Sequence, residues 1–191
     1  MTETVTEAQT PAHFAARLLA WHDTHGRHDL PWQQHIDPYR VWVSEIMLQQ
    51  TQVSTVIPYF QRFTARFSDV RALADAPEDE VLHHWTGLGY YARARNLHKS
   101  AKLMRDAHGG ELPRRFEELA ALPGIGRSTA GAILAIACNE RAPILDGNVK
   151  RVLTRFFAID GDTTKAATLK QLWAIADALT PAQRSGAYTQ A

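Results

Sequence analysis

Two carboxylates stand out as groups that could do chemistry. Glu45 lies in the middle of a strongly apolar segment, where desolvation disfavours a charged carboxylate and suits a general acid near neutral pH. Asp146 follows the apolar triplet at residues 143–145 and precedes a predicted helix. Two carboxylates in different environments are the usual means of breaking a glycosidic bond. Each also has a structural explanation, as a surface ion pair for Glu45 and as a helix N-cap for Asp146.

The segment LPGIGRSTA at residues 122–130 predicts a tight hairpin between two helices. Gly124 and Gly126 supply the permissive backbone that such a turn needs. The helix expected from Ser128 would present unpaired backbone N–H groups, which favour a phosphate and read no base. A plain helix–helix turn remains an equally good explanation of this segment alone.

A run of basic residues follows two aromatic side chains. Tyr90 and Tyr91 precede the cations Arg93, Arg95, Lys99 and Lys102. Such a run is usually a solvated helix face, but neighbouring aromatic rings favour a nucleic-acid surface. We expect one tyrosine to pack in the core and the other to face a ligand.

Apolar residues recur at helical spacing, and no segment alternates with the period of a strand. The sequence therefore predicts an all-α fold. Pro58 falls inside one helical pattern, where we expect a kink or a break. The predicted helices span residues 12–25, 39–50, 53–67, 79–85, 92–107, 114–119, 128–138, 147–157 and 166–179, and a further helix begins near residue 185.

Composition excludes several classes of protein. The 191 residues carry a formal net charge of +1 and are 45% hydrophobic, which excludes global disorder. One cysteine, Cys138, cannot form a disulfide framework or a cysteine metal site within the chain. Neither a membrane-spanning run nor a secretory signal is present, so we expect a cytoplasmic protein.

Taken together, the motifs resemble the helix-hairpin-helix glycosylase superfamily and, within it, the adenine DNA glycosylases of the MutY type. The resemblance covers residues 12–191 and includes the hairpin. Its specificity comes from three long motifs in the same order, SEIMLQQTQV at 44–53, WTGLGYYARARNL at 85–97 and ILDGNVKRVL at 144–153.

The resemblance implies a fold of two helical lobes with the active site in the cleft between them. It implies removal of adenine mispaired with 8-oxoguanine or guanine, after the base has been flipped out of the duplex. By the same resemblance, Glu45 protonates adenine at N7. Asp146 stays ionised and stabilises the oxocarbenium ion of the sugar, with a transient covalent bond as an alternative, before water attacks.

Other positions take family roles in the same way. Gln49 matches the residue that wedges into the duplex, and Tyr90 the one that intercalates near 8-oxoguanine. Leu30 and Trp32 match residues of the adenine pocket, and Gln190 matches one that hydrogen-bonds the flipped base. The DNA-binding positions completing this set are Gly124, Gly126, Ser128, Arg95 and Lys150; Lys150 either contacts phosphate or lies near Asp146.

Ser128 separates two branches of the superfamily. Bifunctional relatives carry a lysine nucleophile at this position, two residues after the second hairpin glycine. Without an amine no Schiff base forms, so we expect a monofunctional hydrolase. Two alternatives remain, a pyrimidine-damage glycosylase or lyase of the superfamily and a hairpin module that only binds DNA.

The family pattern extends beyond residue 191. The family has four cysteines that hold a 4Fe-4S cluster and a C-terminal Nudix-like domain, and this chain contains neither, so we expect a catalytic fragment without a metal or cofactor of its own. We expect residues 1–11 to be a disordered leader, residues 12–191 the helical catalytic region, and residues 115–138 the helix-hairpin-helix. The expected partner is duplex DNA with an A:8-oxoguanine or A:G mismatch, bound by a monomer at the bacterial nucleoid.

Overall fold

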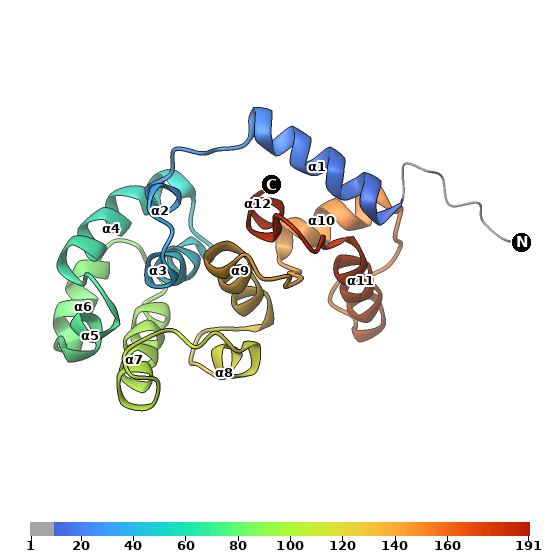
Figure 1. Cartoon of the computed structure of the whole chain (residues 1–191). Helices are drawn as coiled ribbons and strands as arrows, with labels where there is room; N and C mark the ends of the chain where they lie inside the picture. The colour runs from blue at the N-terminus through green and yellow to red at the C-terminus, as the bar shows by residue number, and fades with distance from the viewer. Residues whose placement is uncertain (1–9) are drawn as a thin grey trace, which may run out of the picture. The chain divides into compact units, whose positions relative to one another are not determined.

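The computed structural model describes residues 10–191 and contains helices but no strand in that part of the chain (Figure 1). The helices are α1 (Pro11–His25), α2 (Pro31–Gln34), α3 (Pro38–Leu48), α4 (Val53–Arg66), α5 (Val70–Asp75), α6 (Glu78–Trp85), α7 (Ala92–Ala107), α8 (Phe116–Ala120), α9 (Arg127–Cys138), α10 (Gly147–Phe156), α11 (Ala166–Leu179) and α12 (Ser185–Gln190). The all-α prediction is confirmed. The expected leader lies mostly outside the described residues, and Pro11 already belongs to α1.

Within residues 10–191, three helices begin at an aspartate whose side chain caps the N–H groups of the first turn. Asp37 accepts from the backbone of Tyr39, at 3.0 Å, at the start of α3. Asp69 accepts from Ala72 N at 2.9 Å at the start of α5. Asp146 does the same for α10, so the helix start that carries this carboxylate is set by a local hydrogen bond.

The chain forms two compact units. Residues 28–133 make up one unit, and the segments up to Arg27 and from Leu134 make up the other. Helix α9 contains the boundary between them, after Ile133. Each unit has a core of its own.

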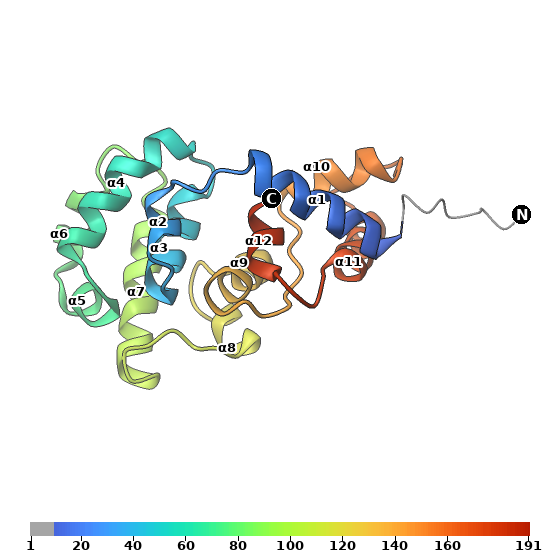
Figure 2. The same cartoon turned by 45° about the horizontal axis from the view of Figure 1, so that its top comes forward.

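The unit of residues 28–133 is built around buried aromatic side chains. Phe63 packs against Phe67 with ring centroids 4.8 Å apart and edge-on against Trp85 at 5.9 Å. Trp42, on α3, is fully buried. Helix α5 packs along α7, as both views show (Figures 1 and 2). This core supports α3 and α7, the helices that carry or adjoin the predicted chemistry.

The other unit packs α1 against α11 and α12, and α10 against α11 (Figure 2). The buried residues of its core are Phe14, Leu145, Leu153, Leu172, Ala176 and Leu179. Residues from the two ends of the sequence therefore share one core. Leu145, the residue directly before Asp146, belongs to this core.

Two local expectations differ from the structure. Helix α4 runs unbroken through Pro58, so the expectation of a break at this residue is wrong. Proline removes the hydrogen bond to the carbonyl of Ser54, but Ser54 is exposed and water can satisfy that carbonyl. The sequence also missed α2 and α5, whose four and six residues are too short to show helical periodicity.

No helix within residues 10–191 combines the length and the apolar character that a membrane crossing requires.

Candidate functional site

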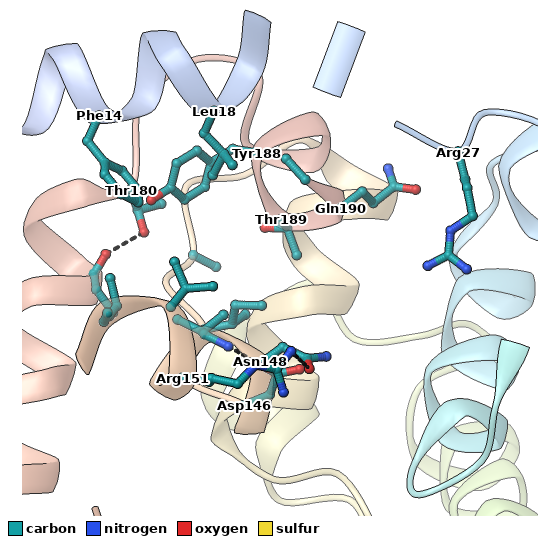
Figure 3. Close-up of a pocket in the computed structure, with 17 residues that line it drawn as sticks. Phe14, Leu18, Arg27, Asp146, Asn148, Arg151, Thr180, Tyr188, Thr189 and Gln190 are labelled. Atoms are coloured by element: carbon teal, nitrogen blue, oxygen red, sulfur yellow. Dashed lines mark hydrogen bonds between the residues drawn. The ribbon is translucent and has the colours of Figure 1, made fainter. Parts of the chain in front are cut away.

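A pocket of about 440 Å³ lies in the unit formed by the two ends of the chain (Figure 3). Its volume is in the range of small-ligand sites. Figure 3 shows Asp146, Asn148 and Arg151 on one side and Tyr188, Thr189 and Gln190 on another. Seventeen residues line it: Phe14, Leu18, Arg27, Ala142, Ile144, Asp146, Asn148, Val149, Arg151, Val152, Leu153, Ala176, Thr180, Tyr188, Thr189, Gln190 and Ala191.

Asp146 is both a cap and a pocket residue. Its Oδ1 accepts a hydrogen bond from Val149 N at 2.8 Å, which holds the carboxylate at the N-terminus of α10. The positive end of the helix dipole stabilises a negative charge there. The side chain is exposed and lines the pocket, so the capping hydrogen bond leaves the carboxylate accessible to a ligand.

Polar side chains from the adjoining segments complete the wall. Gln190 lines the pocket, and its Nε2 donates to Gly186 O at 3.3 Å. Burial raises the pKa of Tyr188 to about 12, so its phenol stays neutral at physiological pH. Asn148 Oδ1 accepts from Arg151 Nη2 at 3.0 Å. The pocket thus combines an aliphatic side with amide, phenol and carboxylate groups.

The other unit carries Glu45 on α3. Glu45 is half-buried between Ser44 and Ile46, which are both buried. Gln49 is the C-cap of this helix, and its side-chain Nε2 donates to Thr129 Oγ1, on α9, at 3.5 Å. The structure therefore brings the segment after α3 beside the first turn of α9.

The hairpin between α8 and α9 is present as predicted, with α9 beginning one residue earlier than expected. Gly124 has φ +79°, and a Cβ there would lie 3.0 Å from the Cβ of Asn96. Gly126 faces open space, because a Cβ there would meet nothing within 4 Å. Its carbonyl accepts from Ala130 N at 2.9 Å, and Ser128 follows in the first turn.

Tyr90 lies in a turn after α6 and is 62% exposed, with φ +49°. Tyr91 is 39% exposed, so the expectation that one of the two tyrosines is a core residue is wrong. The left-handed turn at Gly89 and Tyr90 carries both rings outward. The core position beside this turn is filled instead by the guanidinium of Arg93, which is 8% exposed.

The remaining predicted site residues differ in how far their side chains are exposed. Arg95 is exposed, and its Nε lies 3.7 Å from Oε1 of Glu78. Lys150 is half-buried on α10. Leu30 is half-buried at the start of α2. Trp32 is 6% exposed and packs edge-on against Phe60 at 5.3 Å, as a core residue does.

Each unit thus assembles part of the predicted set. Residues 28–133 contain Glu45, Gln49, Tyr90 and the hairpin, and the other unit contains Asp146 and Gln190 in one pocket. Sequence reasoning did not single out the pocket residues Arg27, Asn148 and Tyr188. Asn148 lies within the motif around Asp146, whereas Arg27 follows α1 and carried no local signal.

The described residues contain no group of three or more His, Cys, Asp or Glu side chains that could hold a metal ion. The chain has a single cysteine, Cys138, and a 4Fe-4S cluster needs four thiolates. The residues present therefore do not fit that cluster.

Comparison with known proteins gives consistent matches. The chain is 47% identical to the adenine DNA glycosylase of Buchnera aphidicola subsp. Acyrthosiphon pisum (strain APS) over 177 residues, covering 93% of this chain and 51% of that protein. It is 43% identical to the human adenine DNA glycosylase over 187 residues, covering 93% of this chain and 34% of that protein. The chain thus spans about half the length of the bacterial relatives it matches.

Solved structures share the fold. A thermostable thymine-DNA glycosylase matches with a TM-score of 0.83 and 26% identity over 94% of this chain and 83% of that one. An endonuclease III trapped on DNA matches with a TM-score of 0.69 and 22% identity over 93% of this chain and 84% of that one. Residues 43–177 match the family described as HhH-GPD superfamily base excision DNA repair protein. With its hairpin and this match over most of its length, the chain belongs to the HhH-GPD superfamily of base excision DNA repair proteins.

Proposed function

We propose that the chain is the catalytic part of a monofunctional adenine DNA glycosylase that excises adenine mispaired with 8-oxoguanine or guanine. The observation that carries the proposal is the 47% identity to an adenine DNA glycosylase across 93% of the chain. The partner is duplex DNA, bound by a monomer at the nucleoid. The pocket beside Asp146, with its neutral phenol and amides, supports the binding of a purine base.

Binding to DNA begins at the hairpin. The N–H groups at the start of α9 suit a backbone phosphate, and the open space at Gly126 lets a strand approach closely. Arg95 and Lys150 add positive charge that neutralises phosphates. Gln49 and Tyr90 enter the duplex at the mismatch, and the adenine leaves the stack.

Chemistry then follows at the sugar. Glu45 donates a proton to N7 of the flipped adenine, and the C1′–N9 bond breaks with both electrons leaving on the base. Asp146 remains ionised and stabilises the oxocarbenium ion. Water adds to C1′ and loses a proton, leaving an abasic site. Leu30 and Trp32 pack near the base, and Gln190 hydrogen-bonds it.

A second candidate is a pyrimidine-type glycosylase, supported by the TM-score of 0.83 to a thymine-DNA glycosylase. The lower identity of that match, 26%, makes it the weaker proposal. Ser128 disfavours the lyase form, since a hydroxyl cannot form the Schiff base that lyase chemistry uses.

Single-turnover release of adenine from an A:8-oxoguanine duplex tests the proposal. A:G, A:T and T:G duplexes run alongside it. We expect release of adenine from the A:8-oxoguanine and A:G duplexes and no base release from A:T or T:G. Glu45→Gln abolishes release, whereas Glu111→Gln, at an exposed carboxylate after α7, leaves the rate unchanged. Release of thymine from T:G without release of adenine would establish the second candidate instead.

A further inference from the structure

Arg93 is a buried cation whose partners are backbone carbonyls. It is the second residue of α7 and is 8% exposed. Its Nη1 donates to the carbonyls of Ile46, Met47 and Gln49 at 3.1, 2.8 and 2.6 Å. Its Nη2 donates to the carbonyls of Leu88 and Gly89 at 3.3 and 3.2 Å. One guanidinium thus joins the end of α3 to the turn before α7.

These contacts satisfy groups that the helix itself leaves open. The last carbonyls of an α-helix have no partner within the helix, and a cation there also meets the negative end of its dipole. Burial lowers the pKa of Arg93, but the guanidinium stays protonated because its ordinary pKa lies far above physiological pH. Arg93 therefore stays positively charged, and hydrogen bonds to the carbonyls of two separate segments stabilise its guanidinium.

Both segments have backbone conformations that need such support. Gln50, directly after the α3 cap, has φ +58°, and Tyr90 has φ +49°. Left-handed backbone is disfavoured for a residue with a Cβ, because the Cβ comes too close to a backbone carbonyl oxygen. Trp85 Nε1 donates to Gly89 O at 3.1 Å, and the Arg93 guanidinium lies 5.4 Å from the rings of both Trp85 and Tyr90.

We propose that Arg93 is a positioning residue that holds the Gln49 segment and the Tyr90 turn as one rigid pair, so that the two side chains enter duplex DNA together. The proposal rests on the proposed function for what the pair does in DNA. The coupling of the two segments stands on the structure of residues 28–133. Arg93 therefore acts through Gln49 and Tyr90 without touching the reacting atoms.

Arg93→Lys is the informative variant. Lysine keeps the positive charge but offers one nitrogen, which cannot reach the carbonyls of both segments as the fork of arginine does. Arg66→Lys is the matched control, because Arg66 pairs with Glu80 at 2.5 Å at the surface of the same unit. Thermal unfolding of the two variants measures general loss of stability.

The first measurement is amide hydrogen exchange of the free protein. In Arg93→Lys we expect exchange in residues 46–51 and 86–92 to speed up together by about tenfold, the effect of losing about one charge-assisted hydrogen bond. Arg66→Lys leaves both segments unchanged. Faster exchange in only one segment, or in neither, would overturn the coupling.

The second measurement follows the flipping of a base out of the duplex in a protein that cannot excise it. Each variant is made in a Glu45→Gln background and bound to a duplex with 2-aminopurine opposite 8-oxoguanine, whose fluorescence rises when it unstacks. At saturating protein, we expect Arg93→Lys to give a much smaller rise than Arg66→Lys on the paired duplex. The two give equal rises where 2-aminopurine faces a missing nucleotide and is already unstacked. Equal rises on both duplexes would overturn the proposal.

Failure of the proposed function has a different outcome. If Arg66→Lys and the parent chain leave 2-aminopurine stacked and the chain releases no adenine, the proposed function is wrong. The exchange measurement then decides the coupling of the two segments by itself.

Discussion

The side chains of Gln49 and Thr129 meet although eighty residues separate them, with Nε2 of Gln49 donating to Oγ1 of Thr129 at 3.5 Å. The contact joins the cap of α3 to the first turn of α9. Under the proposed function, a DNA strand held by a phosphate at the start of α9 lies beside Gln49, the side chain that we propose enters the duplex.

The two hairpin glycines should respond differently to alanine. Gly126→Ala leaves stability unchanged, because its Cβ meets nothing within 4 Å, but it weakens DNA binding by standing where the phosphate approaches. Gly124→Ala costs about 1–2 kcal/mol of stability, because φ is +79° and Asn96 is close. Urea unfolding and a binding titration at fixed salt measure the two effects. A stability loss in Gly126→Ala equal to that in Gly124→Ala would contradict this.

Two roles of Asp146 can be measured separately: the helix cap and the proposed stabilisation of the sugar cation. Asparagine caps a helix about as well as aspartate but carries no charge. Asp146→Asn should therefore keep the melting temperature and, under the proposed function, lower the rate of adenine release by at least about a hundredfold, because the electrostatic stabilisation of the sugar cation is lost. Asp146→Ala should lose the same activity and also about 1 kcal/mol of stability. Equal stability of the two variants would show that the hydrogen bond to Val149 contributes nothing.

The serine at position 128 leads to a clear expectation for borohydride trapping. The wild-type chain should form no covalent complex with DNA, because Ser128 has no amine to form an imine. Ser128→Lys should gain trapping, since it places a primary amine at the position that bifunctional relatives use. Efficient trapping of the wild-type chain that is lost in Ser128→Ala would contradict the monofunctional assignment.

His98 should make stability depend on pH. It is buried, with Nε2 3.0 Å from Ala76 O. Burial and, to a smaller extent, the charge of Lys102 lower its pKa below 6.5, against the opposing effects of the hydrogen bond to the Ala76 backbone and of Glu78. The unfolded chain then binds the proton more readily. Stability contributed by neutral His98 is present above pH 6.5 and is lost below it, by at most about 1.4 kcal/mol per pH unit.

The measurement is urea unfolding between pH 7.5 and pH 5. His98→Gln keeps a donor toward Ala76 but does not titrate in this range, so its stability should fall less steeply as the pH decreases. Because the other histidines are unchanged, the difference between the two slopes reports on His98. Parallel slopes would exclude a contribution from this residue.

Local sequence patterns were enough to predict the longer helices, one helix cap and the hairpin of this protein. Apolar spacing gave the longer helices, since a helix face of three or more turns repeats often enough to be visible. The Asp146 cap and the hairpin turn are also local, because each depends on hydrogen bonds or backbone angles within a few residues. The resemblance of three motifs added the family, which the match to residues 43–177 confirms.

Tertiary packing decided what local patterns could not. Arg93 belongs by sequence to an exposed basic run, yet its carbonyl partners at Ile46 and Met47 come from more than forty residues away. Arg27 reaches the Asp146 pocket only because α1 packs against the C-terminal helices. A side chain's burial depends on which distant backbone groups meet it, and sequence spacing alone carries no information about those contacts.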